Sequence, residues 1–309
     1  CSSDLFIIAF NPGGAYDLYA RLAGRHLGRH IPGSPPVIIQ TMPLAGGLRA
    51  ANYLYEVAPR DGSYIGLIAH NVMEQQVVGA EGISYRAEKY NWIGRMNVIN
   101  EAEVVWLASG AGTIEDAFRK EIVLGASGPT ATPTVYPRVL NVIAGTKFRI
   151  VTGYSGAPES CLAMERGEVQ GCLLDYGNIK TAKRHWLDGP KIGVLFQMGS
   201  TPDPMFPGVR TYVSFGKTEE ERQALAVYST SAEVGRAVMA PPGIPADRVA
   251  ALRAAFAAML KDPEFLADAA KNNLEINGAP GEELQKMIER AASASPAAIA
   301  RAKAAREAQ

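Results

Sequence analysis

The chain has 309 residues, enough for two domains, and its 31 basic and 31 acidic side chains give a formal net charge of zero. A neutral chain of this kind argues against nucleic acid as a partner. No apolar run reaches membrane-spanning length, so the sequence predicts a soluble protein.

A glycine turn follows the first predicted strand. The apolar run 5–10 is too short for a soluble helix and predicts a buried strand, and a helical pattern begins at Asp17. The turn between them is Asn11-Pro12-Gly13-Gly14-Ala15-Tyr16. The first N–H groups of a helix lack intrahelical acceptors and carry partial positive charge, so this turn is a candidate anion site. Asp17 is expected either to cap the helix or to face a donor on a ligand.

The same unit recurs along the chain. Residues 37–40 and 64–69 are predicted strands, separated by a second glycine turn at 43–47 and a helix. Strands alternating with helices predict a mainly parallel sheet with right-handed crossovers. Ligands bind such sheets beyond the carboxyl ends of strands, which is where His70-Asn71 follows the third strand.

A similar pattern fills the second half of the chain. Further strands are expected at 122–126, 148–152 and 169–174. They end in Ser127-Gly128-Pro129-Thr130, in Gly153-Tyr154-Ser155-Gly156 and in Asp175. We therefore predict an α/β protein with two similar domains, residues 1–105 with 236–309 and residues 106–235.

The remaining helices and strands are predicted from the spacing of apolar residues and from helix-start signals. Residues 92–107 hold two short strands, 191–196 one more, and Thr113 is a predicted N-cap. Residues 246–260 predict an amphipathic helix, and the Ala-rich tail is helical in composition, with Pro296 interrupting it. The apolar face of the amphipathic helix consists of Val249, Leu252, Phe256 and Met259; Leu18, Leu22 and Leu27 are apolar positions of the first helix.

Enzyme motifs are incomplete. The first turn lacks the G-x-G-x-x-G of dinucleotide-binding enzymes, and no phosphate loop occurs. The runs around Ser127 and Ser155 resemble the G-x-S-x-G of serine hydrolases but misplace the second glycine. Helix capping is the alternative role for both serines. A hydrolase or transferase on a two-domain scaffold is the alternative to a binding protein.

The three cysteines show no metal-ligand spacing. Cys161 and Cys172 can form a bridge only if their Cα atoms approach within about 7 Å, and we expect free buried thiols. Cys1 resembles the lipid-bearing first residue of a bacterial lipoprotein, but the first strand begins too soon after it for a useful tether, and we expect a trimmed or processed start instead. His26 and His30 are expected on a helix surface, either solvated or as a chance metal pair.

Several weak motifs occur in one order from residue 7 to about 290. They are Phe10-Asn11-Pro12-Gly13-Gly14-Ala15-Tyr16-Asp17, Met42-Pro43-Leu44-Ala45-Gly46-Gly47, Ala58-Pro59-Arg60-Asp61-Gly62, Ala126-Ser127-Gly128, Gly153-Tyr154-Ser155-Gly156, Glu165-Arg166-Gly167-Glu168-Val169 and Pro241-Pro242-Gly243-Ile244-Pro245. Together they resemble the Bug family, the extracytoplasmic solute-binding proteins of tripartite tricarboxylate transporters.

The resemblance implies a two-domain periplasmic binding protein fold, type II-like, with a ligand cleft between the domains. It implies a periplasmic, non-enzymatic monomer without cofactor or metal, its signal peptide removed, that passes a small carboxylate to the membrane components of a transporter. The carboxylate, from a di- or tricarboxylate or an aromatic acid, is expected to bind to backbone N–H groups and hydroxyls, with Arg21 and Arg49 outside the site. By position, the contacts are Pro12, Gly13, Gly14, Ala15, Tyr16, Asp17, His70, Asn71, Ser127, Gly128, Thr130, Tyr154, Ser155, Gly156 and Asp175.

Overall fold

The computed structural model describes residues 4–10, 12, 15–43, 47–129, 131–180, 182–199 and 202–307. The chain divides into two compact units: unit 1 is Cys1–Val98 with Val234–Ser293, and unit 2 is Ile99–Glu233 with Ala294–Gln309. The chain therefore passes from one unit to the other three times. Within the described residues, no helix combines the length and hydropathy needed to cross a bilayer.

Unit 1 is built on a six-stranded sheet of order β11-β4-β10-β3-β1-β2. The strands are β1 (Asp4–Ile8), β2 (Val37–Thr41), β3 (Tyr64–Leu67), β4 (Asn91–Arg95), β10 (Ala237–Ala240) and β11 (Ala279–Pro280). β1 pairs in parallel with β2 and β3, whereas β10 is antiparallel to both β3 and β4, and β11 is antiparallel to β4. The sheet is thus mixed: a parallel βαβαβ core is extended by antiparallel strands.

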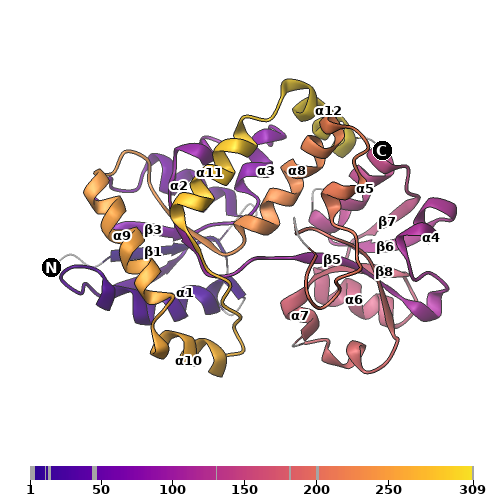
Figure 1. Cartoon of the computed structure of the whole chain (residues 1–309), viewed down its shortest axis with the longest axis horizontal. Helices are drawn as coiled ribbons and strands as arrows, with labels where there is room; N and C mark the ends of the chain where they lie inside the picture. The colour runs from indigo at the N-terminus through magenta and orange to yellow at the C-terminus, as the bar shows by residue number, and fades with distance from the viewer. Residues whose placement is uncertain are drawn as a thin grey trace. The chain divides into compact units, whose positions relative to one another are not determined.

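Helices cover both faces of this sheet (Figure 1). One face is covered by α1 (Ala15–His26), α9 (Ala246–Met259) and α10 (Pro263–Lys271); the other by α2 (Leu48–Glu56), α3 (Val72–Val77) and α11 (Gly281–Ala292). Short 3-10 turns are η1 (Leu27–His30) and η3 (Ala87–Lys89). The predicted apolar face of α9 is buried against the sheet, as are Leu22 and Leu27. Leu18 was expected among the apolar positions but is 42% exposed, because it lies on the outer side of α1.

Unit 2 has a five-stranded sheet of order β7-β6-β8-β5-β9. The strands are β5 (Glu101–Trp106), β6 (Ile122–Ala126), β7 (Phe148–Thr152), β8 (Gly171–Asp175) and β9 (Ile192–Gln197). β6 is parallel to β7 and β8, and β5 is antiparallel to β8 and β9. The sequence placed the domain boundary at 105, but β5 pairs along its length within this sheet, so the units divide at Val98 instead.

The helices of unit 2 also lie on both faces of its sheet (Figure 1). They are α4 (Ile114–Arg119), α5 (Thr132–Ala144), α6 (Ala157–Glu165), α7 (Tyr176–Lys180), α8 (Glu219–Val234) and α12 (Pro296–Glu307), with 3-10 turns η4 (Leu107–Ser109), η5 (Arg184–Leu187) and η6 (Tyr212–Phe215). Thr113 is the N-cap of α4, as predicted.

The C-terminal helix belongs to unit 2, although the sequence assigned it to the first domain. α12 packs against α5, and the Tyr228 hydroxyl donates to the carbonyl of Ala302 at 2.8 Å. Pro296 interrupts the helical tail as expected: α11 ends at Ala292, and Pro296 opens α12. Proline suits a first helical position, where no intrahelical N–H bond is needed.

Cys161 and Cys172 form a disulfide with Cα atoms 5.3 Å apart, so the expectation of free thiols is wrong. Their separation of 11 residues is visible in the sequence, but their geometry depends on packing: Cys161 lies on the face of α6 that packs against β8, where Cys172 is buried. In the chain-entropy model, closing a loop of this size stabilises the fold by about 3 kcal/mol.

His26 and His30 each contact a carboxylate in unit 1. Their Nε2 atoms lie 2.9 Å from Asp268 and 2.9 Å from Asp262, respectively. Within the described residues, no group of three or more histidine, cysteine or acidic side chains has the geometry to hold a metal ion. The two histidines therefore connect α1 and η1 to α10 and its N-cap residue through these contacts.

Candidate functional site

The first predicted site lies at the carboxyl end of β1 in unit 1. Pro12 is exposed, and the rings of Phe10 and Tyr16 stack with centroids 4.4 Å apart. Gly13 and Gly14 lie outside the described residues. α1 begins at Ala15, two residues earlier than expected, so Asp17 is in the first turn and is not the N-cap.

Asp17 is 3% exposed, and both its carboxylate oxygens accept bonds from Arg21 Nε at 2.9 Å. The carboxylate thus binds an arginine one turn along the same helix, and its expected contact with a ligand stays a prediction. Arg21 is half-exposed on the helix surface, as the sequence predicted.

Tyr16 and His70 are joined by two hydrogen bonds. The Tyr16 hydroxyl accepts from the backbone N–H of His70 at 3.1 Å and lies 3.0 Å from Nδ1 of its ring. In the tautomer in which the Tyr16 hydroxyl donates its proton to Nδ1, the ring proton of neutral His70 is on Nε2. Nε2 is buried and has no hydrogen-bond partner among the described residues.

His70 is uncharged at neutral pH. Burial, reinforced by the positive charge of Arg236, lowers the pKa of His70 to about 4. Asn71 follows it as the residue before α3, and its side-chain oxygen accepts a bond from Gln75 at 3.2 Å.

Arg236 also reaches this edge of unit 1, and sequence reasoning did not find it. β10 runs antiparallel to β3, with Val238 opposite Leu67, so the residue just before β10 comes beside the residues just after β3. The guanidinium carbon lies 4.7 Å from the Tyr19 ring centroid and 5.9 Å from that of Tyr16. Arg236 therefore belongs to the same cluster as Tyr16 and His70.

The Arg236 backbone is fixed by two bonds to the neighbouring chain segment. Its N–H donates to Asn97 at 2.8 Å, and its carbonyl accepts from Met96 at 3.1 Å. Gly235 before it has φ +53, and a Cβ there would lie 2.2 Å from the Asn97 carbonyl oxygen. The left-handed conformation and this close approach both require glycine at 235.

In unit 2, Ser127 and Gly128 follow β6. Ser127 is exposed, and the Gly128 carbonyl accepts bonds from the Thr134 hydroxyl at 2.6 Å and from Ala131 N–H at 3.2 Å. α5 begins at Thr132 with Ala131 at the N-cap position, so Ser127 does not cap that helix. Thr130 lies outside the described residues.

The other two strand ends of unit 2 carry acceptors of their own. The backbone N–H of exposed Ser155 donates to the carboxylate of Glu159, which lowers the pKa of Glu159. Gly156 is the N-cap of α6, and Tyr154 before it is half-buried. Asp175 accepts from the backbone N–H of Asn178 at 3.0 Å and from its side-chain amide.

Those predicted residues that the structure describes lie at one edge of each sheet. Ser127 and Tyr154 follow β6 and β7, and Asp175 ends β8; these adjacent strands share one direction and so end at the same edge. In unit 1, Tyr16 and His70 are in direct contact, and Arg236 joins them.

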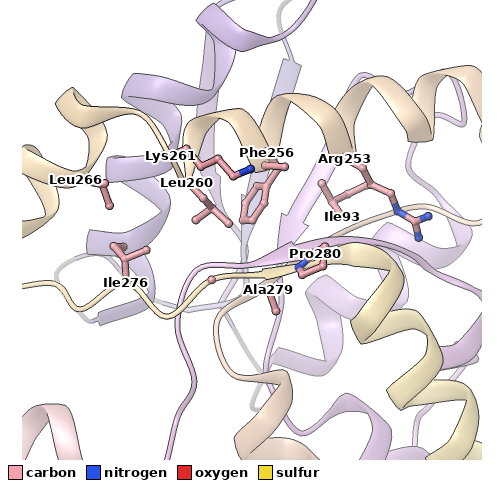
Figure 2. Close-up of a pocket in the computed structure, with 11 residues that line it drawn as sticks. Ile93, Arg253, Phe256, Leu260, Lys261, Leu266, Ile276, Ala279 and Pro280 are labelled. Atoms are coloured by element: carbon pink, nitrogen blue, oxygen red, sulfur yellow. The ribbon is translucent and has the colours of Figure 1, made fainter.

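A separate cavity of about 430 Å³ lies between α9, α10 and β11 in unit 1 (Figure 2). Its walls are mainly apolar, including Phe256, Leu260 and Ile276, with Arg253 and Lys261 as its cations. None of its lining residues belongs to the predicted site. Arg253 Nε already donates to the carbonyl of Trp92 at 2.8 Å, so we do not assign this cavity to a carboxylate.

No family model matches the sequence, and no curated protein matches it. Solved structures do match. A TctC solute-binding protein from Polaromonas, solved without ligand, is 19% identical with a TM-score of 0.72, covering 98% of this chain and 97% of its own. The periplasmic binding protein BugD is 17% identical with a TM-score of 0.64, over 98% and 97% of the two chains.

MatC from Rhodopseudomonas palustris, solved with bound malate, is 18% identical with a TM-score of 0.64 and covers 99% of both chains. Matches of this extent cover both units. The chain therefore has the two-domain periplasmic binding protein fold, as the sequence predicted.

Proposed function

We propose that the chain is an extracytoplasmic solute-binding protein that captures a small carboxylate for a transporter of the tripartite tricarboxylate type. The observation that carries this proposal is the fold match along nearly the whole chain to a TctC solute-binding protein. The malate bound to MatC, which has the same fold, supports a di- or tricarboxylate or a related acid as the ligand.

The proposed contacts in unit 1 are Pro12, Gly13, Gly14, Ala15, Tyr16, Asp17, His70 and Asn71. Those in unit 2 are Ser127, Gly128, Thr130, Tyr154, Ser155, Gly156 and Asp175. Both sets follow strands at the edge where ligands bind in open α/β sheets, and several precede a helix whose first N–H groups suit an anion.

The periplasm is the proposed location. The buried disulfide between Cys161 and Cys172 supports it, since such bridges persist in oxidising compartments. Membrane components of the transporter are the proposed partners, and a monomer is the proposed state. We propose no cofactor and no enzymatic activity.

Ligand-dependent melting tests the function. Acetate, malate, adipate, citrate and benzoate would each be added to the purified chain, and calorimetry would measure the affinity of each acid that shifts the melting temperature. Ligand at a hundred times its dissociation constant should add about 2.7 kcal/mol of stability. Turnover of ester or acyl substrates, without stabilisation by any carboxylate, would instead favour the hydrolase or transferase alternative.

Gly128 offers a variant that tests the site without disturbing the fold. A Cβ at Gly128 meets nothing within 4 Å, so Gly128→Val should fold normally and obstruct an approaching ligand. Gly208 in the same unit is equally open and is the matched control. We expect loss of binding for Gly128→Val and wild-type binding for Gly208→Val; equal affinities would remove Gly128 from the site.

A further inference from the structure

The cluster formed by Arg236, His70 and Tyr16 in unit 1 presents donors without acceptors. Arg236 is 7% exposed, and its Nε is buried with no hydrogen-bond partner in the described part of the chain. No described carboxylate forms an ion pair with its guanidinium. Beside it, Nε2 of His70 is a second buried atom without a partner among those residues.

A buried guanidinium N–H without an acceptor is costly to the folded state. Moving a charge out of water costs several kcal/mol unless a partner compensates it, and buried arginines are ordinarily paired. The faces of Tyr19 and Tyr16 offset part of this cost through cation–π contacts, 4.7 and 5.9 Å from the guanidinium carbon. An aromatic ring does not replace a hydrogen-bond acceptor, so the Nε–H of Arg236 is available to an acceptor on another molecule.

The hydrogen bonds around His70 select the chemistry of that group. The Tyr16 hydroxyl accepts from the His70 backbone N–H and lies 3.0 Å from Nδ1. In the tautomer in which this hydroxyl donates to Nδ1, the neutral ring carries its N–H at Nε2. The cluster therefore combines one fixed positive charge with a neutral donor. An anion with two acceptor oxygens satisfies both, and a planar carboxylate matches the guanidinium fork.

We propose that Arg236 and the Nε2–H of His70 form an anion subsite that binds one carboxylate group of the ligand. The subsite rests on the proposed function for its biological ligand. It differs from the expected site in one respect: a carboxylate meets a charged side chain supplied by the segment before β10, in addition to backbone N–H groups.

Arg236→Met tests the charge while keeping the length of the stem. The affinity for each carboxylate that the wild type binds should fall about ten- to a hundredfold, because a charge-assisted hydrogen bond is lost. Arg236→Lys should recover part of the loss, since it restores the charge without the fork. Arg290→Gln, which removes an exposed cation from α11 in the same unit, should bind as the wild type does.

Stability of the ligand-free protein separates a binding role from a structural one. If Arg236 serves the ligand, removing a buried N–H donor that has no acceptor should leave the melting temperature of Arg236→Met equal to or above that of the wild type. If Arg236 only stabilises the fold, the melting temperature of Arg236→Met should fall, and the folded fraction of this variant should bind the acids with wild-type affinity. The second result would overturn the subsite.

A direct probe is needed that does not depend on the natural ligand. The ring resonances of His70 would be followed by NMR against pH, with and without acetate, in the wild type and in Arg236→Met. Acetate in the subsite should raise the pKa of His70 in the wild type only.

Three outcomes are decisive. Wild-type affinity for the acids in Arg236→Met would overturn the subsite and leave the proposed function standing. An acetate response at His70 without measurable affinity for malate, adipate, citrate or benzoate would support the subsite and overturn the proposed function. The absence of both an acetate response and an effect of Arg236→Met would overturn the subsite whatever the function is.

Discussion

The strand ends of the two units differ in how their polar groups are satisfied. In unit 1, Nε of Arg236 and Nε2 of His70 have no hydrogen-bond partner among the described residues. In unit 2, the N–H of Ser155 is bonded to Glu159 and that of Asn178 to Asp175. A helix terminus is therefore a poor guide to anion binding by itself, because a carboxylate of the chain can occupy its N–H groups. We expect unit 1 to contribute most of the affinity for a carboxylate.

The largest expected effect concerns the stability of unit 2, which contains the disulfide. Wild-type protein refolded under reducing conditions should lose about 3 kcal/mol of unfolding free energy through loss of the Cys161–Cys172 bridge. Hydrogen exchange should locate the loss in unit 2. Cys1→Ser is the control for the third thiol. An equal rise in hydrogen exchange in both units would contradict the expectation that the loss of stability lies in unit 2.

His70 predicts a pH effect confined to unit 1. Its pKa is lowered to about 4, so the folded state binds fewer protons than the unfolded state between that value and 6.5. Stability should fall as pH drops through this range, by about 2 kcal/mol for a partly buried ring. His70→Gln should flatten the wild-type curve of urea midpoint against pH; parallel curves for the two proteins would show that His70 does not titrate as described.

Glu103 predicts the opposite pH effect in unit 2. Both its carboxylate oxygens are buried on β5 without a partner in the described residues, and burial, together with Glu101, raises its pKa well above the usual value. The folded state therefore holds a proton that the unfolded state releases, and this group destabilises the fold increasingly as pH rises above about 4.3.

Glu103→Gln should thus stabilise the protein at pH 7 to 8, with a gain that shrinks toward pH 4. The gain should be smaller than the disulfide loss, because a buried amide at the same place also lacks a partner. Glu115→Gln, an exposed change on α4, is the control for charge alone and should show no such trend. A gain that did not depend on pH would exclude titration of Glu103 as its cause.

The smallest expected effect concerns the carboxylate of Glu159, which occupies an N–H group at the start of α6 in unit 2. Glu159→Gln removes the carboxylate at the start of α6, so a bound carboxylate should meet less repulsion and its dissociation constant should fall about twofold. Calorimetry would measure it beside Glu168→Gln, an exposed control in unit 2. Weaker binding by Glu159→Gln would mean that Glu159 assists the ligand.

The sequence predicts the parallel core of each unit because local signals define it. Residues 122–126 and 148–152 are apolar runs bounded by small residues, and both are strands with the predicted limits. α8 has no such signal: three acidic residues open it, and its apolar positions follow no clear stripe.

Arg236 and the disulfide depend on distant parts of the chain. Arg236 reaches the site because β10 runs antiparallel beside β3. The paired residues Val238 and Leu67 are about 170 residues apart in the sequence. No sequence pattern around Gly235 and Arg236 predicts that this segment lies beside β3. For the same reason, the spacing of Cys161 and Cys172 left their pairing open until the packing of α6 on β8 was known.

The three passages of the chain between units constrain the order in which the protein is built. Unit 1 needs α11, which ends at Ala292, and unit 2 needs α12, whose Ala298, Ala302 and Ala305 are fully buried. A ribosome that has made the first two hundred or so residues has completed neither unit, so folding of both waits for the last helices. Completion of the native packing of both units is consequently a late event in synthesis.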